Sequence, residues 1–192
     1  DTAPLNFRQP SKIRTVISAD FDNDGFDEIF MNNIGQPNKL FKILDNNKLE
    51  QLELTYALEK TGLGTGAAVA DLNGDGILEL LIAHGESAPE PLSLFSAYVK
   101  DDFQYLRIEP RNAFNAPARG ATVILKSNLR THAKTIDAGS GYLCQMEPVA
   151  HFGIRKNEEI QYIQINWTDG QQSKYKIEKL NHQYIFNQGK TN

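Results

Sequence analysis

The sequence predicts an all-β protein, in which partial β-propeller-type blades precede a C-terminal β-sandwich-like domain. Short apolar runs alternate with turn signals along the whole chain, which is typical of such folds. An acidic segment that begins at Asp20 recurs 51 residues later at Asp71, a period in the range of propeller blades. The repeat is lost after about residue 110. We therefore expect two repeats in residues 1–103 and a different β-domain in residues 104–192.

The predicted strands fall into three groups that are separated by Gly, Pro, Asn and Asp. The groups are 13–19, 28–32, 39–44 and 48–54; 66–70, 78–83, 92–99 and 104–108; and 121–126, 131–136, 160–167, 172–177 and 184–186. In the last group, Ile163, Ile165 and Trp167 alternate with polar residues, which gives a strand one apolar face. Asp169-Gly170 then indicates a hairpin turn. A helix over residues 51–60 is the alternative to a strand there.

Composition excludes several classes of function. The net charge of −4 and the scattered Lys and Arg residues argue against a nucleic-acid-binding face. No stretch of about 18 apolar residues is present, so no membrane insertion is expected. Cys144 is the only cysteine, which rules out an internal disulfide or a Cys-rich zinc site. We expect its thiol to be buried and structural. The first residues show no export signal, so an exported chain would have lost it or carried it further upstream.

Both copies of the acidic segment have the spacing of a calcium-binding loop. Counted from the first Asp, oxygen-bearing side chains occupy positions 1, 3, 5 and 9, a glycine occupies position 6, and the carbonyl at position 7 adds a backbone oxygen. The predicted ligands are Asp20, Asp22, Asp24, Phe26 and Glu28 in the first loop and Asp71, Asn73, Asp75, Ile77 and Glu79 in the second. Ca²⁺ takes six to eight such oxygens, whereas Mg²⁺ prefers octahedral sites that keep several waters. The sequence therefore predicts Ca²⁺ as the cofactor.

An EF-hand starts in the same way but needs Glu at position 12 and a helix on each side. Position 12 here is Met31 or Ile82, and the flanking residues are β-like. A strand–loop–strand calcium turn fits better. An acidic surface turn that binds nothing is the other interpretation, but two loops in register favour calcium. The first loop has four carboxylates at ligand positions and the second has three, so charge count predicts tighter binding by the first.

Several motifs resemble the cartilage acidic protein family, in which FG-GAP/VCBS propeller repeats precede an ASPIC/UnbV domain. The repeats are of the FG-GAP type, and the more specific motifs are residues 84–87, 91–93, 116–121, 139–153 and 167–170. This resemblance covers nearly the whole chain and points to the C-terminal part of such a protein. It implies a secreted or surface-exposed protein of calcium-dependent interaction type, without known catalytic activity. Two repeats are too few to close a propeller, which needs about four to eight blades.

Some residues also fit an enzyme. Asp137, Ser140 and His151 supply the residue types of a hydrolytic triad, but residues 138–141 lack the G-x-S-x-G elbow between a strand and a helix. A glycine-rich structural turn is the better interpretation. The four histidines lack zinc-ligand spacing, and we expect Arg119-Gly120 to form a turn anchored by the arginine.

The resulting hypothesis is a calcium-binding, non-enzymatic interaction or adhesion protein. We expect its partner to be a protein or glycan at a cell surface or in a matrix. We expect it to be extracellular or at the cell surface, with the periplasm as the alternative compartment. The alternative function is an accessory or catalytic propeller module of a secreted hydrolase or glycan lyase.

Overall fold

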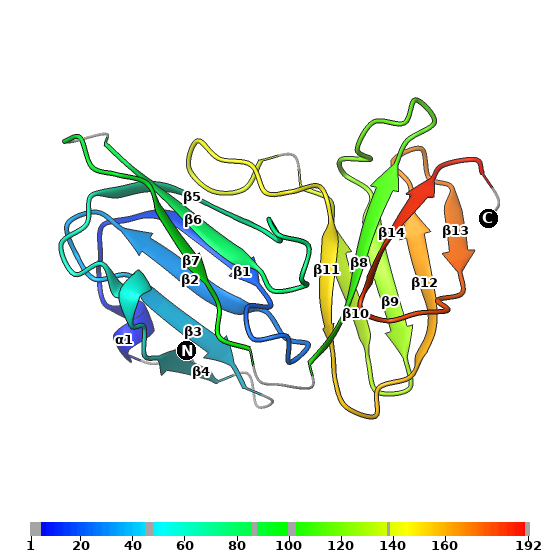
Figure 1. Ribbon diagram of the computed structural model, residues 1–192, viewed down its shortest axis with the longest axis horizontal. Coiled ribbons are helices and arrows are strands. Elements are labelled where there is room, and N and C mark those ends of the chain that lie inside the picture. The colour runs from blue at the N-terminus through cyan, green and yellow to red at the C-terminus, as the bar shows by residue number, and fades with distance from the viewer. Residues whose placement is uncertain (1–4, 45–47, 86–87, 100–102, 138, 191–192) are drawn as a thin grey trace. The chain divides into compact units, whose positions relative to one another are not determined.

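The computed structural model describes residues 5–44, 48–85, 88–99, 103–137 and 139–190 (Figure 1). Two predicted features fall partly outside these ranges: residues 84–87 of the family-like motifs and residue 138 of the elbow-like segment. The chain divides into two compact units. The first consists of residues 1–22, 26–98 and 139–146, and the second of residues 23–25, 99–138 and 147–192.

The first unit contains two antiparallel sheets, both of which are meanders. The four-stranded sheet has β1 (Ile13–Ala19), β2 (Glu28–Asn33), β3 (Lys39–Ile43) and β4 (Leu49–Leu52) in that order. The three-stranded sheet has β5 (Gly64–Ala70), β6 (Glu79–His84) and β7 (Ser93–Ser96). A one-turn helix, α1 (Leu5–Arg8), precedes the first sheet, and a 3₁₀ turn, η1 (Tyr56–Leu58), joins the two. The sheets share one apolar core, which includes Ile17 and Phe30 from one side and Val69 and Ile82 from the other.

The sequence repeat is also a repeat of strand register. In the first sheet Ala19 pairs with Glu28 across the β1–β2 hairpin, and in the second Ala70 pairs with Glu79 across β5–β6. Each hairpin also has an irregularity at the far end of its first strand, between residues 13 and 15 and between residues 64 and 66. Each acidic loop therefore closes the same kind of hairpin at the same register.

The second unit is a β-sandwich. One sheet has the order β10 (Thr131–Thr135), β9 (Thr122–Ser127), β12 (Ile160–Asn166) and β13 (Gln172–Tyr175). The other has β11 (Ala150–Ile154), β8 (Gln104–Arg111) and β14 (His182–Asn187), and β14 runs parallel to β8. Inward-facing residues of both sheets form one core, which includes Leu106 and Phe152 from one sheet and Val123 and Ile165 from the other.

The predicted all-β class, with blades followed by a sandwich, is confirmed by this arrangement. The hairpin predicted at Asp169-Gly170 joins β12 to β13, and Gly170 adopts the positive φ of +87° that such a turn favours. Arg119 donates to the Asp137 carbonyl beside Gly120, which also has a positive φ, as expected for an anchored turn.

Three local expectations were wrong or incomplete. The alternative helix over residues 51–60 is absent, because this stretch finishes β4 and then forms only η1. The strand β11 was not predicted, since all five of its residues are buried and its sequence shows no alternation. The helix α1 was not predicted either. Within the described residues, no helix is long and apolar enough to span a membrane.

Candidate metal centre

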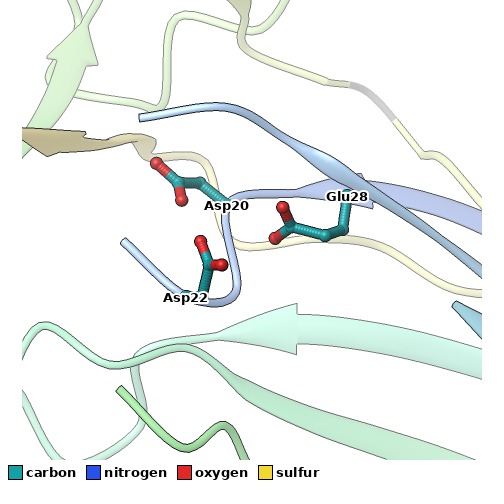
Figure 2. Close-up of side chains that lie close together, drawn as sticks. All are labelled: Asp20, Asp22 and Glu28. Carbon is teal, nitrogen blue, oxygen red and sulfur yellow. The ribbon is translucent and has the colours of Figure 1, made fainter. Parts of the chain in front are cut away.

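Three carboxylates come together where the first acidic loop leaves β1 and enters β2. Asp20, Asp22 and Glu28 each offer an oxygen, and these oxygens all lie within 4.8 Å of one another (Figure 2). Asp20 follows the last residue of β1 and is fully buried, whereas Glu28 is the first residue of β2 and is 1% exposed. The β1–β2 pairing brings the two ends together, so the chain between them curls and carries Asp22 toward the same point.

The two oxygens of Glu28 have different surroundings. Oε2 accepts a hydrogen bond from the Phe21 amide at 3.0 Å, whereas Oε1 is buried and accepts none within the described structure. A cation also approaches the cluster, since Lys42 of β3 has its Nζ 2.7 Å from Asp22 Oδ2 and 3.6 Å from Glu28 Oε1. A buried carboxylate oxygen without a hydrogen bond is costly, and it is suited to a metal ion.

These surroundings change the acidity of Glu28. Burial raises its pKa to about 8, and the charges of Asp22 and Asp20 act in the same direction. Lys42 and the Phe21 amide lower the pKa but do not offset the rise. Without a bound cation, the site therefore disfavours a third negative charge.

Asp24, the fourth carboxylate at a predicted ligand position of the first loop, is not one of the three side chains in this cluster. Asn23, Asp24 and Gly25 belong to the second compact unit, where the Asp24 carbonyl accepts a hydrogen bond from Arg155 Nε at 3.1 Å. Gly25 has a φ of +91°, and a Cβ added there would lie 2.6 Å from the guanidinium of Arg130. The positive φ favours glycine at this position, and a larger residue would also displace the guanidinium group. Phe26 follows Gly25 and is half-buried.

The second loop has similar backbone geometry but a more open arrangement of side chains. Asp71 accepts hydrogen bonds from the amides of Gly74 and Gly76 at 2.8 and 3.0 Å. Asp75 accepts one from the Ile77 amide at 2.8 Å, and Glu79 Oε2 accepts one from the Leu72 amide at 2.8 Å. This last bond repeats the one between Glu28 and Phe21.

Asn73 and Asp75 are exposed at the surface of the second loop, whereas Glu79 is 6% exposed. Asn73 Nδ2 donates to Asp75 at 2.9 Å. Among the residues that the structure describes, the first loop holds the only group of three metal-ligating side chains whose oxygens converge this closely.

The donor set of the first loop fits a calcium ion. It consists of hard oxygen ligands only, two of its three carboxylates are buried, and Glu28 Oε1 has no hydrogen bond. The predicted ligands of the second loop are also oxygen donors, held by a curled backbone at the same hairpin register.

Sequence reasoning missed Lys42. It lies in a predicted strand, and it is directly opposite Glu28 in the β2–β3 register. The only sequence signal for the position of Lys42 was that a second hairpin follows the first loop. The length of the connecting turn, which fixes the register, could not be read from the sequence.

Asp22 and Glu28 also line a cavity of about 710 Å³ in the first unit. Its wall is otherwise mostly apolar and comes from both sheets, with Phe30 and Leu40 on one side and Leu80 and Phe95 on the other. Glu53 is a further carboxylate in this wall, and it is exposed.

The residues of the hypothetical triad belong to different compact units. Ser140 belongs to the first unit, whereas Asp137 and His151 belong to the second. His151 Nε2 lies 2.6 Å from Asn23 Oδ1, and Nδ1 lies 3.4 Å from Arg107. Both ring nitrogens of His151 thus have a polar side chain beside them. This is typical of a histidine that supports the fold and not of a general base.

Cys144 and His84 both have polar neighbours in the described structure. Cys144 is half-buried instead of buried, and its Sγ donates to the Tyr142 carbonyl. Burial raises the pKa of this thiol, which favours the less reactive protonated form. The partners of His84 are Glu59 and the Pro91 carbonyl, at 3.1 and 2.7 Å.

His151 should make the second unit sensitive to acid. Burial, with the charges of Lys134 and Arg107, holds its pKa well below the usual value of about 6.5. The unfolded chain takes up a proton near that value while the folded chain does not, so the free energy of unfolding falls as pH falls below it. We expect His151 to contribute a loss of up to about 2 kcal/mol between pH 6.5 and pH 5.

The measurement is urea unfolding followed by the fluorescence of Trp167, which is the only tryptophan and is 4% exposed in the second unit. His151→Gln should be less stable than the parent at pH 7.5, and this difference should shrink at pH 5. The exposed His182→Gln is the matched control and should follow the parent. An equal difference at both pH values would contradict the prediction.

Comparison with known proteins agrees with the two-part architecture. Residues 20–82 match the family model of the FG-GAP-like repeat, and residues 111–192 match that of ASPIC and UnbV. The two matches do not overlap, and the repeat model matches the earlier part of the chain.

In an alignment 179 residues long that covers 88% of the chain, it is 46% identical to cartilage acidic protein 1 of Homo sapiens. Its identity to the proteins of that name from Mus musculus and Xenopus tropicalis is 45% over the same length. The resemblance to the cartilage acidic protein family that was predicted from the motifs is thus confirmed. The chain spans 27–28% of the length of these relatives.

Proposed function

We propose that this chain is a calcium-binding, non-enzymatic interaction module of an extracellular or cell-surface protein. The proposed division places the calcium-binding repeats in residues 1–103 and the ASPIC/UnbV-like domain in residues 104–192. The observation that carries the proposal is the convergence of Asp20, Asp22 and Glu28 within 4.8 Å, at a hairpin register that the second loop repeats.

The proposed ligands extend this cluster to both loops. In the first loop, Asp20, Asp22 and Glu28 would hold the ion together with Asp24 and the Phe26 carbonyl. The second set would be Asp71, Asn73, Asp75, Glu79 and the Ile77 carbonyl. A bound Ca²⁺ would offset the repulsion among the carboxylates and supply the missing partner of Glu28 Oε1. Because each loop joins two strands of one sheet, the role of the ion would be to stabilise the blade.

Calcium should raise the melting temperature of the parent chain. We expect dissociation constants on the order of 10⁻⁴ to 10⁻³ M, so calcium at ten times that value should stabilise the chain by about 1.4 kcal/mol per site. Asp20→Asn should remove the contribution of the first loop and Asp71→Asn that of the second. The measurement is a melting curve for each variant in EDTA and in calcium, with calorimetric titration of calcium.

Asp27→Asn is the matched control in the first loop. This carboxylate lies at position 8, between two proposed ligands, and accepts a hydrogen bond from Ser18. It should keep the calcium-induced shift of the parent, and magnesium should give a smaller shift than calcium. If calcium neither bound to the parent nor shifted its melting, the calcium function would be refuted.

The extracellular setting and the partner are supported by homology to cartilage acidic protein 1. The proposed partner is a protein or glycan of a cell surface or matrix. The test is retention of the parent chain on immobilised matrix extract in calcium and its release by EDTA, with the double variant Asp20→Asn/Asp71→Asn as the control. Equal retention of parent and double variant would show that calcium does not govern the interaction.

The alternative, a catalytic or accessory module of a hydrolase or glycan lyase, has less support. Such a site needs a pair of carboxylates, or a nucleophile with a base, in a cleft away from the calcium loops. In the described cavity, Asp22 and Glu28 belong to the loop itself, and the remaining carboxylate is the exposed Glu53.

A further inference from the structure

The two acidic loops differ in the residue that faces their last carboxylate. In the first sheet, Glu28 of β2 is paired directly with Lys42 of β3. In the second sheet, the equivalent Glu79 of β6 is paired directly with Ser96 of β7. Side chains of directly paired residues lie on the same face of a sheet. The first loop therefore has an ammonium group where the second has a hydroxyl.

The geometry of Lys42 is that of a counter-ion. Its Nζ lies 2.7 Å from Asp22 and 3.6 Å from Glu28 Oε1, and its side chain is only 20% exposed. Lys42 thus approaches two of the three converging carboxylates, including the buried oxygen that accepts no hydrogen bond in the described structure. The positive charge of Lys42 therefore acts on the same carboxylates that a bound metal ion would contact.

Lys42 also removes the difference in charge between the loops. The first loop has four carboxylates at ligand positions and the second has three. With Lys42 included, both have a formal charge of −3. The expectation that the first loop binds calcium more tightly rests on the extra carboxylate, and Lys42 offsets it.

We infer that Lys42 is a resident counter-ion that stabilises the first loop without calcium and competes with calcium for Asp22 and Glu28. This inference rests on the proposed calcium function. A divalent ion at the cluster would repel the ammonium group, so Lys42 has to move away for calcium to bind. The second loop has no such competitor at the equivalent position, and its stability depends more strongly on calcium.

The test exchanges the two residues. Lys42→Gln keeps most of the side-chain length without the charge, and it is made together with Asp71→Asn so that titration reports on the first loop. Ser96→Lys is made together with Asp20→Asn so that titration reports on the second. Lys42→Arg retains the charge and is the matched control. The readouts are calcium affinity by calorimetry and melting temperature in EDTA.

Lys42→Gln should increase the calcium affinity of the first loop roughly tenfold, since affinity in such loops follows ligand charge. It should also lower the melting temperature in EDTA, because the carboxylates lose their counter-ion. Ser96→Lys should reduce the affinity of the second loop by a similar factor. Lys42→Arg should resemble the parent in both readouts.

The outcomes separate this inference from the proposed function. If the parent binds calcium and Lys42→Gln binds it no more tightly, the competition is refuted while the calcium function stands. If no variant and no parent chain binds calcium, both are refuted. An unchanged melting temperature of Lys42→Gln in EDTA refutes the counter-ion role whatever calcium does.

Discussion

Arg130→Ala should lower the free energy of unfolding of the second unit by about 3–5 kcal/mol, because it leaves a buried carboxylate without its cation. Arg130 Nε lies 2.8 Å from Glu158 Oε1, and the Glu158 side chain has no exposed surface. Arg130 also donates to the Gly153 carbonyl at 2.6 Å. The measurement is urea unfolding followed by Trp167 fluorescence.

The stability that the Arg130–Glu158 ion pair contributes should also depend on pH. Burial alone would raise the pKa of Glu158, but hydrogen bonds from Arg130, Ser127 and the Arg155 amide lower it below the ordinary value. A lowered pKa contributes stability that is present above the ordinary value of about 4.5 and is lost as pH falls through the folded value. The difference between parent and Arg130→Ala should therefore shrink in acid.

Two controls accompany this prediction. Lys156→Ala removes an exposed cation that is close to Glu158 in the sequence, and it should change stability by less than about 0.5 kcal/mol. Adding Glu158→Gln to Arg130→Ala should recover part of the loss, because the stranded charge is gone. A loss below about 1 kcal/mol for Arg130→Ala would show that Glu158 is well solvated without its partner.

Phe152→Ala should have a comparable effect, with a loss of about 3–5 kcal/mol. Phe152 lies in β11 with no exposed surface, and its ring packs edge-on against His132 at 5.5 Å. Truncation removes a buried ring and leaves a cavity between the sheets of the sandwich. The same unfolding measurement tests it. Phe114→Ala is the matched control, since that ring is 90% exposed and should contribute less than about 0.5 kcal/mol.

The fold was predictable where local pattern and tertiary structure agree. The acidic repeat located two hairpins, and alternation at Ile163, Ile165 and Trp167 located β12. The sequence could not show β11, because burial on both faces removes alternation and its His and Gly do not favour a strand. Nor could it show that β14 pairs with β8, since this contact joins distant segments.

The candidate site was predictable to a similar extent. Spacing alone indicated that Asp20, Asp22 and Glu28 belong to one loop, and the structure brings these three together. The same spacing also predicts Asp24 as a ligand, but its side chain is not in the cluster of three. Neither that exclusion nor the position of Lys42 is encoded within the loop. Both depend on segments that meet it in space.

The parallel pairing of β8 with β14 also has consequences for the kinetics of folding. Arg107 and Gln183, which are hydrogen-bonded across this pair, are separated by 76 residues, whereas the strands of the β1–β2 and β5–β6 hairpins are neighbours in the chain. Closing a long loop costs entropy before any contact compensates for it, and topologies with distant contacts fold slowly. The blade hairpins should therefore form early, and β14 should dock late. Until it does, one edge of β8 is open to pairing with another chain, so the yield of refolding should depend on protein concentration.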